Sequence, residues 1–113
     1  MIEPGKAALK IYVTLETCDM RKSFNGLFAA VSQQLSDGRL GTDTLFVFLN
    51  KRKDRIKLLY FDGSGLWVAA KRLEVGRFSW PTADQGQTKL SLRPEALQML
   101  LDGVDLRGAT LRP

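Results

Sequence analysis

Short apolar segments separated by polar turns dominate the hydrophobic pattern of this chain, and their period changes along it. In residues 7–15, AALKIYVTL, apolar and polar positions roughly alternate and β-branched side chains are frequent, which predicts a first strand. From 19 to 36 the apolar residues recur at helical spacing, which predicts one long amphipathic helix. Its apolar stripe consists of Met20, Phe24, Leu27, Phe28, Val31 and Leu35. Thr17 or Asp19 would cap the start of this helix, and Gly38 would end it.

Residues 44–80 predict an antiparallel β-meander. Its strands are TLFVFLN (44–50), RIKLLYF (55–61) and LWVAAKR (66–72), all rich in aromatic or β-branched residues. The polar segments KRKD and DGSG separate them as turns. Phe78 and Trp80 alternate with Ser79, which indicates a short edge strand at 77–80 that leaves dimerisation by strand addition open.

The C-terminal part predicts a polar loop at 82–89 and a short helix at 94–101, with Pro94 in its first turn and Gly103 at its end. Residues 106–113 are expected to fray. Together these elements predict a single α+β domain over residues 1–113. It would hold an antiparallel β-meander with an N-terminal strand, one long amphipathic helix packed on the sheet, and a short C-terminal helix.

Length and composition are those of one ordinary globular domain. The chain has 113 residues, 44% of them hydrophobic and 26% charged. No apolar run approaches the roughly 18 residues of a membrane span. The first ten residues contain Glu3 and Pro4 and lack the apolar core of a signal peptide, so we expect a cytoplasmic protein.

The residues available for catalysis are few. The chain has no histidine, which excludes zinc sites built from cysteine and histidine as well as Ser–His and Cys–His nucleophile pairs. Cys18 is the only cysteine, and we expect it to be a buried or half-buried thiol. The twelve acidic residues show no spacing typical of a magnesium site. We therefore expect no catalytic residue, no metal and no cofactor.

Positive charge is concentrated in the predicted meander. The formal net charge is +5, from 17 basic and 12 acidic residues, and the isoelectric point is near 9.7. Eight of the basic residues but only three acids, Asp54, Asp62 and Glu74, lie between Lys51 and Arg77. A basic protein of this kind favours a polyanionic partner.

The register of the meander decides where these cations point. With four-residue turns, Phe48 pairs with Lys57, and Arg55 pairs with Arg72. Because side chains alternate across a strand, one face is almost purely apolar and is expected to pack on the first helix. This face consists of Leu45, Val47, Leu49, Ile56, Leu58, Tyr60, Trp67 and Ala69. The other face has cations at one end and Phe46, Phe48, Leu59, Phe61, Leu66 and Val68 behind them.

These positions predict a basic patch for nucleic acid at one corner of the sheet. It consists of Lys51, Arg52, Lys53, Arg55, Lys57, Lys71 and Arg72. Arg21 and Lys22, at the start of the predicted helix, form a second candidate phosphate site. The alternative for the corner is a charged sheet edge that only keeps the protein soluble, and the alternative for Arg21 and Lys22 is a solvated first helical turn. A one-residue slip in register would move Arg55 and Lys57 to the opposite face of the sheet. Phe46, Phe48, Trp67 and Trp80 invite base stacking, although such aromatics are more often core.

Four segments of the chain together resemble a known family. They are DMRKSFNGL (19–27), LFVFLNKRKDRIKLLYFDGSG (45–65), KRLEVGRFSWP (71–81) and LQMLLDGVD (97–105). Over about residues 11–105 the chain resembles the TnpB-type, Orf2-like accessory proteins of the insertion-sequence sixty-six class of bacterial transposable elements. The resemblance implies a role in transposition beside a separate, larger transposase. It implies no catalytic residues.

Three functions follow as hypotheses. The first is a non-catalytic accessory protein of transposition that binds DNA through the basic patch. The second is a protein-interaction module that recruits or stabilises the transposase or another element-encoded protein, with Phe46, Leu59 and Val68 as its surface if no helix covers them. The third is an enzyme, such as a metal-dependent nuclease using Asp19, Asp54 and Asp62. We favour the first over the third because these aspartates more simply cap a helix and two turns.

Overall fold

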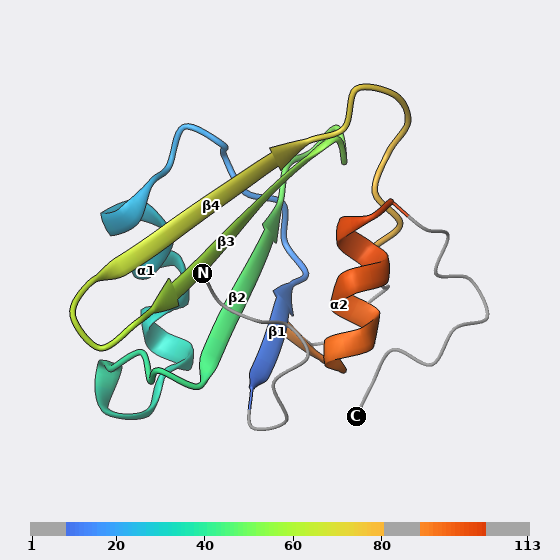
Figure 1. Cartoon of the computed structure of the whole chain (residues 1–113). Coiled ribbons are helices and arrows are strands. Elements are labelled where there is room, and N and C mark those ends of the chain that lie inside the picture. Colours follow the sequence, from blue (N-terminus) through green and yellow to red (C-terminus); the bar gives the residue numbers. More distant parts are fainter. Residues whose placement is uncertain (1–8, 81–88, 104–113) are drawn as a thin grey trace.

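One mixed five-stranded sheet forms the centre of the fold. The computed structural model describes residues 9–80 and 89–103. The strands are β1 (Lys10–Thr14), β2 (Thr44–Leu49), β3 (Arg55–Phe61), β4 (Leu66–Arg72) and β5 (Lys89–Leu92). They are arranged in the order β4-β3-β2-β1-β5 (Figure 1). This confirms an α+β fold and the meander of β2, β3 and β4, with Phe48 opposite Lys57 and Arg55 opposite Arg72.

The sheet is not purely antiparallel, and that part of the prediction is wrong. β1 pairs with β2 in parallel, with Ile11 opposite Leu45, and pairs antiparallel with β5. A parallel neighbour needs a long crossover connection, and the segment between β1 and β2 supplies one that contains a helix. β5, with the sequence KLSL, was not predicted, and Lys89 belongs to it rather than to a polar loop.

The first helix is shorter than predicted. Helix α1 spans Phe24–Val31, and short 3-10 turns follow at Ser32–Gln34 and Ser36–Gly38. Ser23, rather than Thr17 or Asp19, occupies the N-cap position. Residues 19–22 form a turn closed by the Lys22 N–H and the Asp19 carbonyl oxygen at 3.1 Å. Met20 and Leu35 keep the expected contacts with the core but make them from outside the helix.

Two separate cores lie on the two faces of the sheet. Helix α2 (Pro94–Leu101), whose bounds the sequence predicts, packs on one face through Ala96, Leu97 and Leu100. The sheet residues below it include Ile11, Val13, Leu45, Val47 and Leu49. Helix α1 covers the opposite face, where Leu27 and Val31 contact Phe46, Phe48 and Leu59 (Figure 1). The prediction that the first helix covers the Leu45 face is therefore wrong, because that face is occupied by α2.

The segment after β4 is not a strand, so the predicted edge strand at 77–80 is wrong. The Phe78 N–H donates to the Lys53 carbonyl oxygen at 2.7 Å, and the Trp80 indole donates to the Thr14 carbonyl oxygen at 3.2 Å. These contacts fold the segment back over the sheet, and β4 and β5 are the edges. Dimerisation through residues 77–80 loses its structural basis. The predicted loop at 82–88 and the tail at 106–113 lie outside the described residues.

Asp62 organises the turn between β3 and β4. Its carboxylate accepts hydrogen bonds from the N–H groups of Ser64 and Gly65 at 2.8 and 2.9 Å, and from the Trp67 indole at 2.8 Å. Gly63 takes a φ of 101°, which favours glycine. The backbone hydrogen bond from Ser64, followed by the one from Trp67, holds the pKa of Asp62 far below its usual range.

This lowered pKa predicts acid sensitivity. A carboxyl group whose pKa is lowered by folding stabilises the protein fully above its unfolded pKa, near 4, and loses that contribution as the pH falls toward the folded value. We expect Asp62→Asn to unfold at lower urea than the parent at pH 7, and the difference between the two proteins to shrink as the pH is lowered from about 5 to 2. A gap in urea midpoints that stays constant over this range would contradict the assignment.

Candidate nucleic-acid interface

The turn between β2 and β3 is built by Asn50. Its Oδ1 atom accepts hydrogen bonds from the N–H groups of Asp54 and Arg55 at 3.1 and 3.0 Å, and its Nδ2 donates to the Asp54 carboxylate at 2.7 Å. The bond from Asn50 lowers the pKa of Asp54. Lys53 adopts a left-handed φ of 62°, and its carbonyl oxygen accepts the Phe78 N–H. The turn is therefore fixed by the hydrogen bonds of Asn50 within it and by the hydrogen bond from the segment after β4.

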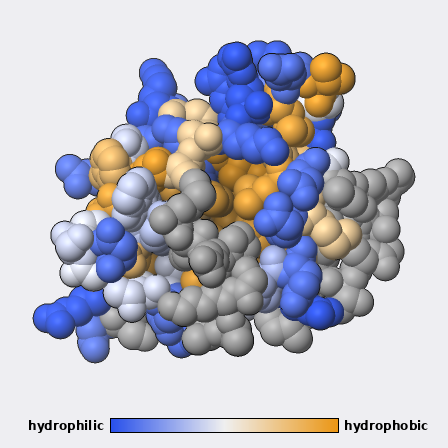
Figure 2. Space-filling view, viewed as in Figure 1, coloured by the Kyte–Doolittle hydropathy of each residue, from blue (hydrophilic) through white to orange (hydrophobic). Residues whose placement is uncertain are grey.

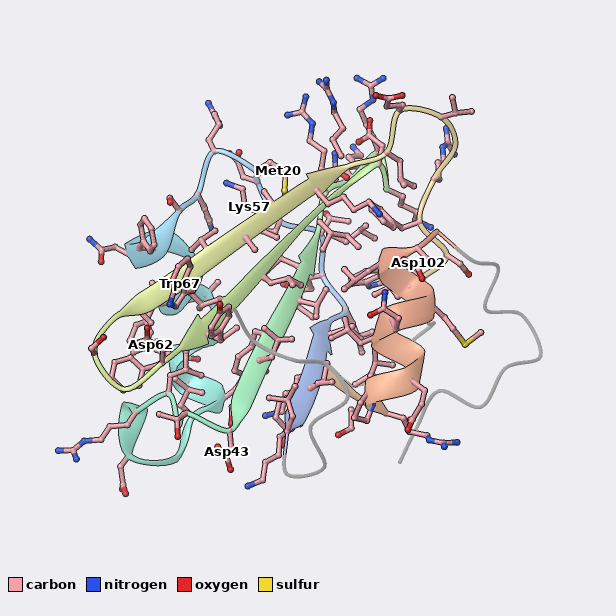
Figure 3. All side chains as sticks on the ribbon, viewed as in Figure 1. Met20, Asp43, Lys57, Asp62, Trp67 and Asp102 are labelled. Atoms are coloured by element: carbon pink, nitrogen blue, oxygen red, sulfur yellow. The ribbon has the colours of Figure 1, made fainter. Side chains whose placement is uncertain are left out.

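Five predicted cations gather at this end of the sheet, and we call them the basic corner. They are Lys51, Arg52, Lys53, Arg55 and Arg72. All five side chains are exposed, and within residues 9–80 and 89–103 none of them forms an ion pair. Arg55 and Arg72 lie directly opposite on neighbouring strands. The hydrophilic cap above the ends of β3 and β4 is visible in Figure 2, and the projecting basic side chains in Figure 3.

Two cations of the predicted patch are engaged inside the protein. The Lys57 ammonium donates to the carbonyl oxygens of Met20 and Lys22 at 2.7 and 2.8 Å and so fixes the loop that leads into α1 (Figure 3). The Lys71 ammonium donates to the Leu101 carbonyl oxygen at 2.6 Å, at the C-terminal end of α2. A cation there satisfies an end carbonyl and complements the helix dipole. Both lysines thus have structural tasks that their sequence positions do not reveal.

Arg21 and Lys22 lie in the loop before α1 rather than in its first turn. The Arg21 guanidinium pairs with the Asp19 carboxylate, with Nη2–Oδ2 at 2.6 Å. This side-chain bond, with a second bond from the Arg21 N–H, lowers the pKa of Asp19 to about 2. Lys22 is exposed and forms no ion pair within the part of the chain that the structure describes. Of these two predicted site residues, Lys22 is the one whose charge is not already matched by a neighbouring carboxylate.

A shallow groove of about 350 Å³ joins the corner to this loop. Met20 forms one wall, while Arg55, Lys57, Ala70 and Arg72 form the rest together with Ile56 and Lys71. Arg55 and Arg72 point to the α1 face of the sheet, in register with Lys57 and Ala70. The groove therefore has a basic rim and an aliphatic floor, which suits a phosphate chain that brings its charge to the rim.

The other residues considered for catalysis or metal binding, Cys18 and three aspartates, do not form a common site within the described residues. Cys18 is half-buried, as predicted, and burial raises the pKa of its thiol. Asp19, Asp54 and Asp62 are each held by a different local set of hydrogen bonds. Residues 9–80 and 89–103 contain no group of three acidic or cysteine side chains placed to hold a metal ion. In the same residues, neither helix is long and apolar enough to cross a membrane.

The aromatic residues divide between core and surface. Phe46 and Phe48 are fully buried, and Trp80 is half-buried with its indole hydrogen-bonded. Trp67 is 49% exposed but lies on the α2 face of the sheet, stacked on Tyr60. The stacking surface predicted from these four side chains is therefore reduced to Trp67. Sequence reasoning placed Asn50 in a strand and missed its role, although an asparagine that precedes a turn and bonds its backbone is a known turn signal.

The different tasks of neighbouring cations predict opposite effects on stability. Lys57→Gln removes two charge-assisted hydrogen bonds and should lower the free energy of unfolding by about 1.5–3 kcal/mol. Arg55→Gln removes the repulsion between Arg55 and Arg72 on neighbouring strands and should raise the free energy of unfolding by about 0.2–1 kcal/mol at low salt. Urea denaturation at low and high salt tests both, because only the second effect should vanish in about 1 M salt. A loss of stability in Arg55→Gln would mean that its charge is already matched.

Comparison of the sequence with known proteins shows the family of this chain. Residues 9–110 match the family of IS66 Orf2-like proteins. The uncharacterized protein y4jC of Sinorhizobium fredii is 38% identical over 114 residues, covering 100% of this chain and 93% of its own length. The uncharacterized protein y4hO of the same organism is 34% identical over 104 residues, covering 92% and 88%. No solved structure matches the chain. A family match over nearly the whole chain, with two relatives of almost full coverage, places this protein in the IS66 Orf2-like family of transposition-associated proteins.

Proposed function

We propose that the protein is a non-catalytic accessory factor of bacterial DNA transposition that acts in the cytoplasm and binds DNA through the basic corner. One observation carries this proposal. Five exposed cations sit together on a rigid turn and two strand ends, and within the described residues no carboxylate lies within ion-pair distance of them. The Asp54 carboxylate attracts Arg52 and Arg55, but the five cations still repel one another in the free protein, and phosphates would supply the further negative charge.

The geometry favours contacts with the phosphate backbone over contacts with base edges. The cations lie on a turn and two neighbouring strands, and none of them belongs to either helix of the described residues. Phe46 and Phe48, the two aromatic residues of the α1 face that were candidates for stacking, are buried in the core and cannot stack on bases. Binding would therefore depend strongly on salt, with a slope near −4.5 in log affinity against log salt if five phosphates are neutralised, and only weakly on sequence.

The absence of catalysis is part of the proposal. Asp19, Asp54 and Asp62, which were the candidates for a nuclease, are held by Arg21, by Asn50 and by the Asp62 turn respectively. Each carboxylate has its own local partners, and residues 9–80 and 89–103 bring no three such groups together to hold the metal that a nuclease would need. Catalysis of transposition would then remain with a separate transposase.

A second candidate function, recruitment of the transposase or another element-encoded protein, has a different surface from the one the sequence predicts. Phe46 and Leu59 are fully buried beneath α1, and Val68 is half-buried against the same core, so the predicted patch does not exist as a surface. On the opposite face Trp67 is 49% exposed and stacks on Tyr60 with ring centres 6.0 Å apart. An exposed tryptophan on an edge strand is typical of a protein-binding surface.

The DNA-binding proposal predicts loss of binding upon charge reversal. The parent should bind a labelled duplex from the element end in low-salt fluorescence anisotropy, and a variant with Lys51, Arg52, Lys53 and Arg55 all changed to Glu should not. The single variant Arg52→Glu has a matched control in Arg93→Glu, which changes the net charge by the same amount. Arg93 precedes α2 and lies at the other end of the sheet. Only the Arg52 variant should weaken binding. If the parent binds neither element-end DNA nor random DNA at low salt, the proposal is wrong.

The recruitment hypothesis makes a separate prediction. In about 0.5 M salt, where phosphate contacts are weak, the tagged chain should co-purify with the transposase of its element, and Trp67→Ala should abolish this. Val75→Ala, at a position 89% exposed on the chain after β4, serves as the control for a lost apolar group. Capture that is equal for the parent and the Trp67 variant would exclude this surface.

A further inference from the structure

A second basic cleft lies on the α1 face, at the opposite end of the sheet from the basic corner. It has a volume of about 240 Å³ and lies between the first halves of β1 and β2 and the loop after α1. Lys89, which is opposite Thr14 on β1, reaches into it with its side chain. Tyr12 and Phe46 form its aromatic wall, and Gln34 and Arg39 line the loop side. Asp43 marks its position at the start of β2 in Figure 3, whereas Met20 and Lys57 mark the corner end. We call it the Lys89 cleft.

Lys89 is the central cation of this cleft. Its ammonium sits 4.4 Å from the centre of the Tyr12 ring and 5.9 Å from that of Phe46, and it donates one long hydrogen bond, 3.4 Å, to the Gln34 carbonyl oxygen. The side chain is half-buried, and within the described residues it forms no ion pair. Ring faces hold the ammonium in place but do not neutralise it. A positioned and partly desolvated cation without a carboxylate partner is suited to an incoming anion.

The charge around Lys89 is also unbalanced. Arg39 and Lys10 line the same cleft, and the single carboxylate in its lining is that of Asp43. That carboxylate is engaged by Lys10 at 3.6 Å and by the Thr44 hydroxyl at 3.1 Å. These contacts, the Thr44 hydrogen bond first, lower the pKa of Asp43. Arg39 is exposed and forms no ion pair within the same residues, so two cations, Lys89 and Arg39, remain for a ligand.

A polar group beside these cations is also unsatisfied. The buried Oε1 atom of Gln34 has no hydrogen-bond partner among the described residues. A buried acceptor without a donor is costly, and a ligand or water that brings an N–H or O–H group relieves the cost. The cleft therefore offers two cations for an anion, which is what a phosphate group requires.

We infer that the Lys89 cleft binds a phosphate group of the same DNA that contacts the basic corner; the inference thus rests on the proposed function. The two sites share the α1 face. The Lys89 ammonium lies over Tyr12 and Phe46, and Phe46 is opposite Leu59, so the ammonium is about four residues from Arg55, or about 13 Å along the strands. Phosphates of one strand repeat every 3.4 Å along a duplex axis, so the two sites are about four phosphates apart along this direction. A duplex on this face would then be held at two points on either side of α1, which fixes its direction.

The test measures how binding of a labelled 20-bp duplex depends on salt. Lys89→Gln combined with Arg39→Gln should weaken binding about tenfold or more near 0.1 M salt and reduce the salt slope by one to two. Arg39→Gln alone, at an exposed loop position, keeps the test valid if the double variant is unstable. Gln98→Glu, at an exposed position of α2 on the opposite face of the sheet, changes the net charge by the same amount and is the control for Arg39→Gln. Lys89→Arg should restore part of the affinity. Unchanged affinity and slope in both cleft variants would overturn the inference while leaving the basic corner intact.

A second arm separates the cleft from the proposed function. Inorganic phosphate titrated into the labelled full chain should shift the amide signals of Gly41, Thr44 and Lys89 in NMR spectra. These shifts should persist when the four corner cations are reversed and disappear in the double cleft variant. If the parent binds no DNA but shows these shifts, the cleft is an anion site and the proposed function is wrong. If phosphate leaves all three signals unmoved, the anion site itself is refuted.

Discussion

Burial of β2 on both faces is the constraint from which the rest of this structure follows. Its residues Leu45–Leu49 are at most 2% exposed, with alternate side chains in the two cores. Fully burying one such side chain contributes about 1.5–3 kcal/mol, whereas an exposed ion pair contributes about 0–1. A strand buried on both faces needs a helix on each, so α1 and α2 must lie on opposite sides. β2 itself carries no charged residue, and the cations of both basic sites lie on the neighbouring strands, turns and loops.

The meander could be predicted from the sequence because turn lengths fix its register, and KRKD and DGSG mark both turns. The faces were assigned wrongly because only one of them was treated as core, although Phe46, Phe48 and Leu59 made the other equally apolar. A continuous apolar run such as TLFVFL is itself the signal of a strand covered on both sides. The order strand, helix, strand around α1 likewise indicated parallel pairing. β5 is only four residues long and comes shortly before Pro94, so its residues were interpreted as part of the polar loop and of the segment that leads into the following helix.

Charge clustering along the sequence located the basic corner but did not show which of its cations are free. Lys57 and Lys71 lie on adjacent strands and point to opposite faces, and each reaches carbonyl oxygens of a segment distant in sequence. Those acceptors depend on where α1 and α2 pack, which no local pattern reveals. The Lys89 cleft escaped sequence reasoning for a related reason. It joins residues near positions 10, 39, 43 and 89, and only the parallel β1–β2 pair and β5 bring them together.

Protection of a sheet edge is the strongest competing explanation for the corner, and it accounts for only part of it. Charged side chains on an edge strand discourage pairing with other chains, which explains Arg72 on β4. Arg55, however, lies on β3, an inner strand with partners on both sides, and faces Arg72 directly. A pair of opposite charges at these two positions would keep the edge soluble and would also stabilise the sheet, because opposite charges across strands attract. Two guanidinium groups placed there beside three further cations are what the proposed polyanion would neutralise.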